Sequence, residues 1–110
     1  MWTREEAIWV VERLEPLLAE VGAHCALSGS VMYRGTSDKD LDLIIYPHAN
    51  KPLDVQENSP VSNVLQKFFK CDKLNDATAG NGYDKGDDTS RLILYCWTPK
   101  GKRVDFFFLD

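Results

Sequence analysis

The sequence predicts one α/β domain over residues 1–110. Two segments, residues 3–22 and 59–69, repeat apolar residues at the three- and four-residue steps of an amphipathic helix. Short runs rich in β-branched and aromatic residues, typical of strands, lie between and after these segments. A chain of 110 residues has room for one domain of ordinary size.

The first predicted helix has boundary signals at both ends. Thr3 and Glu6 have the spacing of a capping box, and Gly22 suits the left-handed position after a last helical turn. Between them one apolar stripe runs from Ala7 to Val21. Because a proline ring clashes with the carbonyl four residues earlier, we expect Pro16 to bend or split this helix.

Two strands are expected before the second helix. Residues 24–28 form a short run of small and apolar residues that ends at Gly29-Ser30, and residues 41–46 form a longer run ended by Pro47. Between these strands, residues 31–34 have room for a turn or two of helix.

The second helix and a hairpin complete the domain. Ser59-Pro60 places a capping residue before a proline at the first helical position, which is the preferred order. Residues 91–98 and 102–109 are β-rich runs joined by Thr98-Pro99-Lys100-Gly101, a type I turn sequence. Both faces of residues 92–97 are apolar, so we expect an interior strand covered by helices.

The polar stretch at residues 72–90 predicts a loop, with a short strand near 71–74. Recognition commonly resides in loops on a rigid scaffold, so this loop is the expected source of specificity.

Composition excludes several classes of protein. The net charge of −4 disfavours a nonspecific nucleic-acid binder, which needs a basic face. No stretch approaches the roughly 20 apolar residues of a membrane span, and the first six residues lack a signal-peptide core. Three cysteines at irregular spacing fit neither a disulfide framework nor a zinc site. We therefore expect a cytoplasmic protein with reduced, structural cysteines.

Two aspartates carry the first chemical signal. On a strand, residues two apart face the same way, so Asp40 and Asp42 project together while Leu41 points into the core. Two neighbouring carboxylates repel each other unless a cation lies between them. Asp38 and Asp40 are the alternative pair, but that register would bury Lys39. An EF-hand starting at Asp38 is excluded, because its sixth and twelfth positions lack the required glycine and glutamate.

Two further features support a cation and phosphate site. Gly29 permits close backbone approach, and the Ser30 hydroxyl with the adjacent amides offers donors to phosphate oxygens. Asp105 interrupts an apolar strand, where an unpaired carboxylate would cost several kcal/mol, and a metal ion explains it.

Together these residues resemble the nucleotidyltransferase superfamily built on the DNA polymerase β palm, and within it the minimal single-domain nucleotidyltransferases. The family pattern is Gly-Ser, about ten residues, acid-hydrophobic-acid before a hydrophobic strand, and a later third acid. Here the pattern is Gly29-Ser30, nine residues, Asp40-Leu41-Asp42, and then Asp105. Arg34-Gly35 and Ser37-Asp38 also look like the family's intervening stretch.

The resemblance implies a mixed sheet of about four to five strands with helices packed on one side. It implies transfer of a nucleoside monophosphate from a triphosphate, such as ATP, to a hydroxyl of a protein or RNA acceptor. Asp40, Asp42 and Asp105 would be catalytic and would hold two Mg²⁺ ions, for which Mn²⁺ can substitute. Gly29, Ser30 and Arg34 would bind the nucleotide, although Arg34 could equally be a solvated helix residue.

An interaction module is the alternative. Many relatives carry a helical domain after the third acid, and none is visible in this sequence. The chain could therefore be a partner-dependent or inactive domain of this fold, such as an antitoxin-like module with a helical partner or a protein of a phage or mobile element.

Several other polar and aromatic residues are not expected to be catalytic. His24 and His48 have no partner at useful spacing. Tyr83 and Trp97 could stack on a base, but Trp97 is expected in the core. Lys100, Lys102 and Arg103 form a basic hairpin tip, a kind of cluster that is usually solvated.

Overall fold

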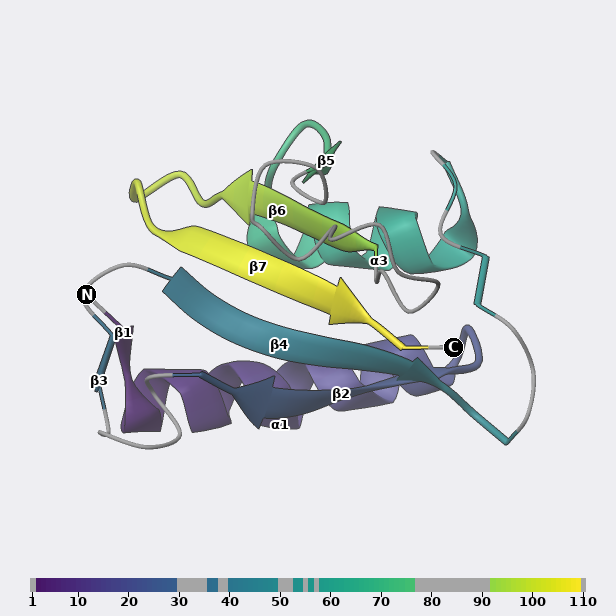
Figure 1. Cartoon of the computed structure of the whole chain (residues 1–110), viewed down its shortest axis with the longest axis horizontal. Helices are drawn as coiled ribbons and strands as arrows, with labels where there is room; N and C mark the ends of the chain where they lie inside the picture. The colour runs from purple at the N-terminus through teal and green to yellow at the C-terminus, as the bar shows by residue number, and fades with distance from the viewer. Residues whose placement is uncertain are drawn as a thin grey trace, which may run out of the picture.

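A computed structural model gives the fold of the chain, with its elements shown in Figure 1. The structure describes residues 2–29, 36–37 (backbone only), 40–49, 53–54, 56, 58–76 and 92–109. Two helices and seven strands are assigned within these residues.

Helix α1 (Arg4–Ala19) forms where the capping signals predict it. The Thr3 hydroxyl accepts a hydrogen bond from the Glu6 amide, and the Glu6 carboxylate accepts one from the Thr3 amide. Ala7, Val10, Leu14 and Leu18 are buried along one face of the helix. Pro16 lies inside this helix, which is not split.

Helix α3 (Pro60–Phe69) is confirmed as well. Ser59 caps it by accepting a hydrogen bond from the Ser62 amide, and Pro60 stands at the first helical position. The helix ends at Lys70, whose φ of 56° is left-handed. Its apolar face packs toward the core through Val61, Leu65 and Phe69.

The main sheet has five strands in the order β2-β4-β7-β6-β5. Only β4 and β7 are parallel, and the other neighbours are antiparallel. The strands are β2 (Ala23–Ser28), β4 (Asp40–Pro47), β5 (Asn75–Asp76), β6 (Ile93–Trp97) and β7 (Arg103–Phe108). A separate two-stranded ribbon pairs β1 (Trp2–Thr3) with β3 (Thr36–Ser37).

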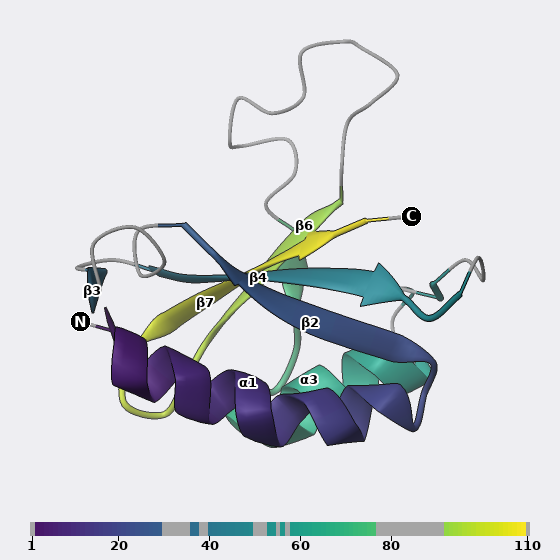
Figure 2. The same cartoon turned by 90° about the horizontal axis from the view of Figure 1, so that it is seen from below.

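Both helices lie on the same face of the main sheet (Figure 2). The core fills the space between, and the strands contribute alternate residues to it. On β4 these are Leu41, Leu43 and Ile45; on β7, Val104 and Phe106 are fully buried. The intervening residues, including all three predicted metal-binding aspartates, face the side that no described helix covers.

The predicted fold class is confirmed, since a mixed five-stranded sheet carries helices on one side. Two local predictions are wrong. Strand β6 is interior to the sheet, yet described helices cover only one of its faces, so Trp97 is 53% exposed. The short strand expected near residues 71–74 lies at Asn75–Asp76. The helical turn expected at 31–34 and residues 77–90 of the predicted loop lie outside the described residues.

Within the described part of the chain, neither helix combines the length and apolar character that a membrane crossing requires.

Candidate functional site

Strand register brings four polar residues into one row across the sheet. Ser28 pairs with Asp42, Asp42 with Asp105, and Asp105 with Tyr95. Paired residues on neighbouring strands point to the same face. The row therefore lies on the face opposite the helices. Asp40 and Arg103 pair with each other two residues before Asp42 and Asp105 on the same two strands.

Three carboxylates meet where Asp40 adjoins this row. One oxygen each from Asp40, Asp42 and Asp105 lies within 4.8 Å of the others, close enough for the group to hold a metal ion. The Asp105 side chain is 10% exposed and that of Asp40 is 31% exposed, so the cluster opens toward solvent on the β4 side.

The donor set suits a hard divalent cation. All three ligands are carboxylate oxygens, the type that Mg²⁺ and Mn²⁺ prefer. Two oxygens on one Mg²⁺ lie at most about 4.2 Å apart, twice the usual bond length. The carboxylate oxygens, all within 4.8 Å of one another, are spaced close to this limit.

Two of the carboxylates, Asp42 and Asp105, have raised pKa values. Burial, and then the negative charges of Asp105 and Asp40, raise the pKa of Asp42 to about 6. Burial likewise raises the pKa of Asp105 to about 6, with Asp40 adding to the shift and Arg103 opposing it. An added cation would relieve this repulsion, as the like charges alone predicted.

Arg103 supplies positive charge at the cluster. Its Nε donates a hydrogen bond of 2.8 Å to Asp105 Oδ1 and lies 3.9 Å from Asp40 Oδ1. Its guanidinium carbon lies 4.0 Å from the centroid of the Tyr95 ring. The prediction of a solvated basic hairpin tip is therefore wrong for Arg103. The spacing Arg103-x-Asp105 on one strand is the signal that could have revealed it.

Gly29 abuts the cluster. Its φ is +75°, and a Cβ atom built there would lie 2.0 Å from Asp42 Oδ2 and 2.8 Å from Asp42 Cγ. Only a residue without a side chain allows the Asp42 carboxylate this position. The predicted proximity of Gly29 to the aspartates is found. Ser30, Arg34 and Asp38 lie outside the described residues.

No family model, curated protein or solved structure matches the chain.

A second polar cluster lies at the far end of β2. The Glu15 carboxylate accepts a hydrogen bond from His24 Nδ1, and His24 Nε2 lies 2.9 Å from His48 Nδ1. The prediction that these histidines lack partners is wrong. Glu15 and His24 are nine residues apart on different elements, so no sequence periodicity could have joined them.

The three cysteines are free thiols, as predicted. Burial raises the pKa of Cys25 to about 12 and also raises the pKa of Cys71 and Cys96. The thiolate is the reactive form, so these thiols are poor nucleophiles near neutral pH.

Proposed function

We propose that this protein is a Mg²⁺-dependent nucleotidyltransferase that moves a nucleoside monophosphate from a nucleoside triphosphate to a hydroxyl of a protein or RNA acceptor. The observation that supports this is the meeting of Asp40, Asp42 and Asp105 beside Gly29, on the sheet face that neither described helix covers. The sequence motifs that resemble the superfamily contain these same four residues.

In the proposed reaction the acceptor oxygen attacks the α-phosphorus, and the bond from that phosphorus to the bridging oxygen breaks. Pyrophosphate leaves with the bonding electrons, and the hydroxyl proton passes to solvent. Asp40 and Asp42 would hold both Mg²⁺ ions, and Asp105 would hold one. Bound ions would neutralise charge on the attacking and leaving oxygens.

The chain's own residues prepare this arrangement. Arg103 orients the Asp105 carboxylate through its 2.8 Å hydrogen bond. Gly29 leaves space at Asp42 that any other residue would fill, and its backbone can approach a bound phosphate closely.

Transfer of label from an α-labelled triphosphate tests the proposal. The full chain is incubated with Mg²⁺, each of the four α-labelled nucleoside triphosphates, and either RNA or protein acceptors. We expect covalent labelling from the α-position and none from the γ-position, since phosphoryl transfer would move the γ-label instead. Asp42→Asn and Asp105→Asn should abolish labelling.

The matched control is Asp54→Asn. Asp54 is an exposed aspartate in the loop after β4 whose carboxylate accepts a hydrogen bond from the Gln56 amide. This variant should label acceptors like the parent. Equal labelling by Asp42→Asn and the parent would refute the site.

Arg103 favours one alternative function, an inactive or partner-dependent interaction module. Its guanidinium already offsets part of the negative charge at Asp105 and Asp40 without any ion. Calorimetry separates the two. An absence of heat on titration with a triphosphate and Mg²⁺ at millimolar levels, together with tight binding of a helical protein, would favour the module.

A further inference from the structure

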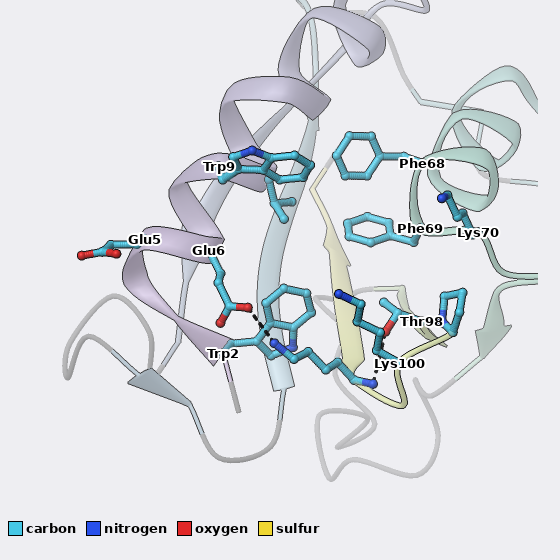
Figure 3. Close-up of a pocket in the computed structure, with 12 residues that line it drawn as sticks. Trp2, Glu5, Glu6, Trp9, Phe68, Phe69, Lys70, Thr98 and Lys100 are labelled. Carbon is cyan, nitrogen blue, oxygen red and sulfur yellow. Dashed lines mark hydrogen bonds and ion pairs between the residues drawn. The ribbon is translucent and has the colours of Figure 1, made fainter.

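A cavity of about 610 Å³ lies on the helix side of the sheet, away from the carboxylates. Its walls are the first turns of α1, the end of α3 and the turn between β6 and β7 (Figure 3). Ligand-binding cavities typically measure about 300–1,000 Å³, so this one has the volume of a small-molecule site.

Four aromatic side chains, Trp2, Trp9, Phe68 and Phe69, line the cavity. Trp2 and Phe69 are only 6% and 5% exposed and make the inner part. Trp9 is 51% exposed, and its ring centroid lies 6.5 Å from that of Phe68. Leaving half of a tryptophan in water is unfavourable, and an aromatic ligand would cover that surface.

Three lysines and two glutamates, Glu5 and Glu6, line the cavity. Lys70, Lys100 and Lys102 line the cavity in a protein whose net charge is −4. Lys102 is paired with Glu6, its Nζ lying 2.7 Å from Glu6 Oε2. Among the described residues, no carboxylate lies within ion-pair distance of Lys70 or Lys100. These two ammonium groups can therefore receive an anion.

Labelled side chains lie at both ends of the cavity. Trp9 and Phe68 face each other at one end, and Trp2, Thr98 and Lys100 lie at the other (Figure 3). A partner helix needs a trough open along its axis, whereas a compact molecule needs only an entrance.

We propose that this cavity binds a small aromatic anion, with the ring among Trp2, Trp9 and Phe68 and the anionic group at Lys70 and Lys100. The cavity lies on the opposite side of the sheet from the aspartates. A test of this proposal is therefore independent of the nucleotidyltransferase proposal.

Fluorescence titration of the full chain with 1-anilinonaphthalene-8-sulfonate tests this. The probe is an aromatic sulfonate, and it is excited directly so that loss of a tryptophan does not alter the signal. Trp9→Ala should weaken binding about tenfold, because it removes the ring surface. Lys70→Ala combined with Lys100→Ala should weaken it about threefold.

Two comparisons make the test specific. Trp97→Ala is the matched control, because Trp97 is also half exposed, at 53%, but does not line this cavity. It should bind the probe like the parent. The neutral analogue N-phenyl-1-naphthylamine should lose affinity in Trp9→Ala and keep it in the double lysine variant.

Equal affinity of the sulfonate for Trp9→Ala and the parent would overturn the proposal, provided circular dichroism shows both to be folded. So would equal losses in Trp9→Ala and Trp97→Ala. Light scattering that shows a parent dimer and a Trp9→Ala monomer would also overturn it, because a second copy would then occupy the cavity.

Discussion

Arg103 and Asp105 project from the same face of β7, and the Arg103 Nε donates a 2.8 Å hydrogen bond to Asp105 Oδ1. The guanidinium is packed against the Tyr95 ring, and it also lies near Asp40. One cation thus faces two members of the carboxylate cluster. This pair connects the stability of the sheet to the charge state of the candidate site.

Replacing Arg103 with Met should destabilise the fold at neutral pH. The change leaves the Asp105 carboxylate, whose side chain is 10% exposed, without its cation, at a cost of about 2 kcal/mol in the free energy of unfolding. The loss should shrink near pH 4.5, where Asp105 is protonated. Urea unfolding at both pH values measures this loss.

The control is Lys102→Met, which breaks the more exposed pair with Glu6 and should cost under about 1 kcal/mol at neutral pH. Equal losses in the two variants would contradict a special role for Arg103.

Asp42→Asn should stabilise the protein in chelator, and increasingly so as pH rises. The native pKa of about 6 exceeds the ordinary value of 3.8, so between these values the native state keeps a proton that the unfolded state has released. Asp42 therefore lowers stability as pH rises through this window, and the penalty is complete above about pH 6. We expect a gain of about 1 kcal/mol at pH 7, discounted because the side chain is partly exposed. A lower free energy of unfolding for the variant at pH 7 would indicate a structural aspartate instead.

Divalent cations should raise the melting temperature of the parent. Binding to the native carboxylates stabilises by mass action, so millimolar Mn²⁺ should raise Tm and chelator should reverse the shift. The shift should grow from pH 5 to pH 7.5, because protons compete for Asp42 and Asp105, whose pKa values are raised to about 6. Scanning calorimetry measures it. A shift as large in Asp105→Asn would place the ion elsewhere.

Gly29→Ala should disturb the site more than its backbone conformation alone explains. The new Cβ would meet Asp42 Oδ2 at 2.0 Å, so the carboxylate must move. Gly22→Ala is the matched control, because its φ of +80° is equally left-handed but no atom of the described residues lies within 4 Å of the added atom. We expect Gly22→Ala to cost about 1 kcal/mol in the free energy of unfolding and Gly29→Ala about 1–2 kcal/mol more.

Only Gly29→Ala should lose the rise in melting temperature that Mn²⁺ causes. Combining Gly29→Ala with Asp42→Ala should recover part of the excess loss in urea unfolding.

Local signals predicted the helices and the aspartate pair well. The helix caps at Thr3, Glu6 and Ser59 could be predicted because their hydrogen bonds span only three residues. Asp40 and Asp42 share a face because side chains alternate along any strand. Asp105 lies near Asp40 and Asp42 because β4 and β7 pair in parallel. Local sequence patterns could not predict this pairing, and the expectation that the three aspartates meet came from the resemblance to the family.

Other features depend on tertiary packing and could not be predicted. Alternation along β6 shows that Tyr95 and Trp97 share a face, but not that described helices leave this face uncovered. The aromatic cavity joins residues from both ends of the chain, because β1 lies near the β6–β7 turn, where Trp2 Nε1 donates to the Arg103 carbonyl. No spacing in the sequence encodes such a meeting.

Glu15→Ala should destabilise the edge of the sheet. Strand β2 is an edge strand, and the Glu15 carboxylate accepts hydrogen bonds from the Cys25 amide at 3.4 Å and from His24 Nδ1. Its removal leaves an edge amide open to pairing with another chain. We expect a loss of about 1 kcal/mol in urea unfolding and concentration-dependent association by light scattering. Glu12→Ala, at an exposed position of the same helix, should change neither measurement. If Glu12→Ala loses as much stability and associates as much as Glu15→Ala, the Glu15 contacts do not protect the edge. Both effects would then follow from removing any glutamate of α1.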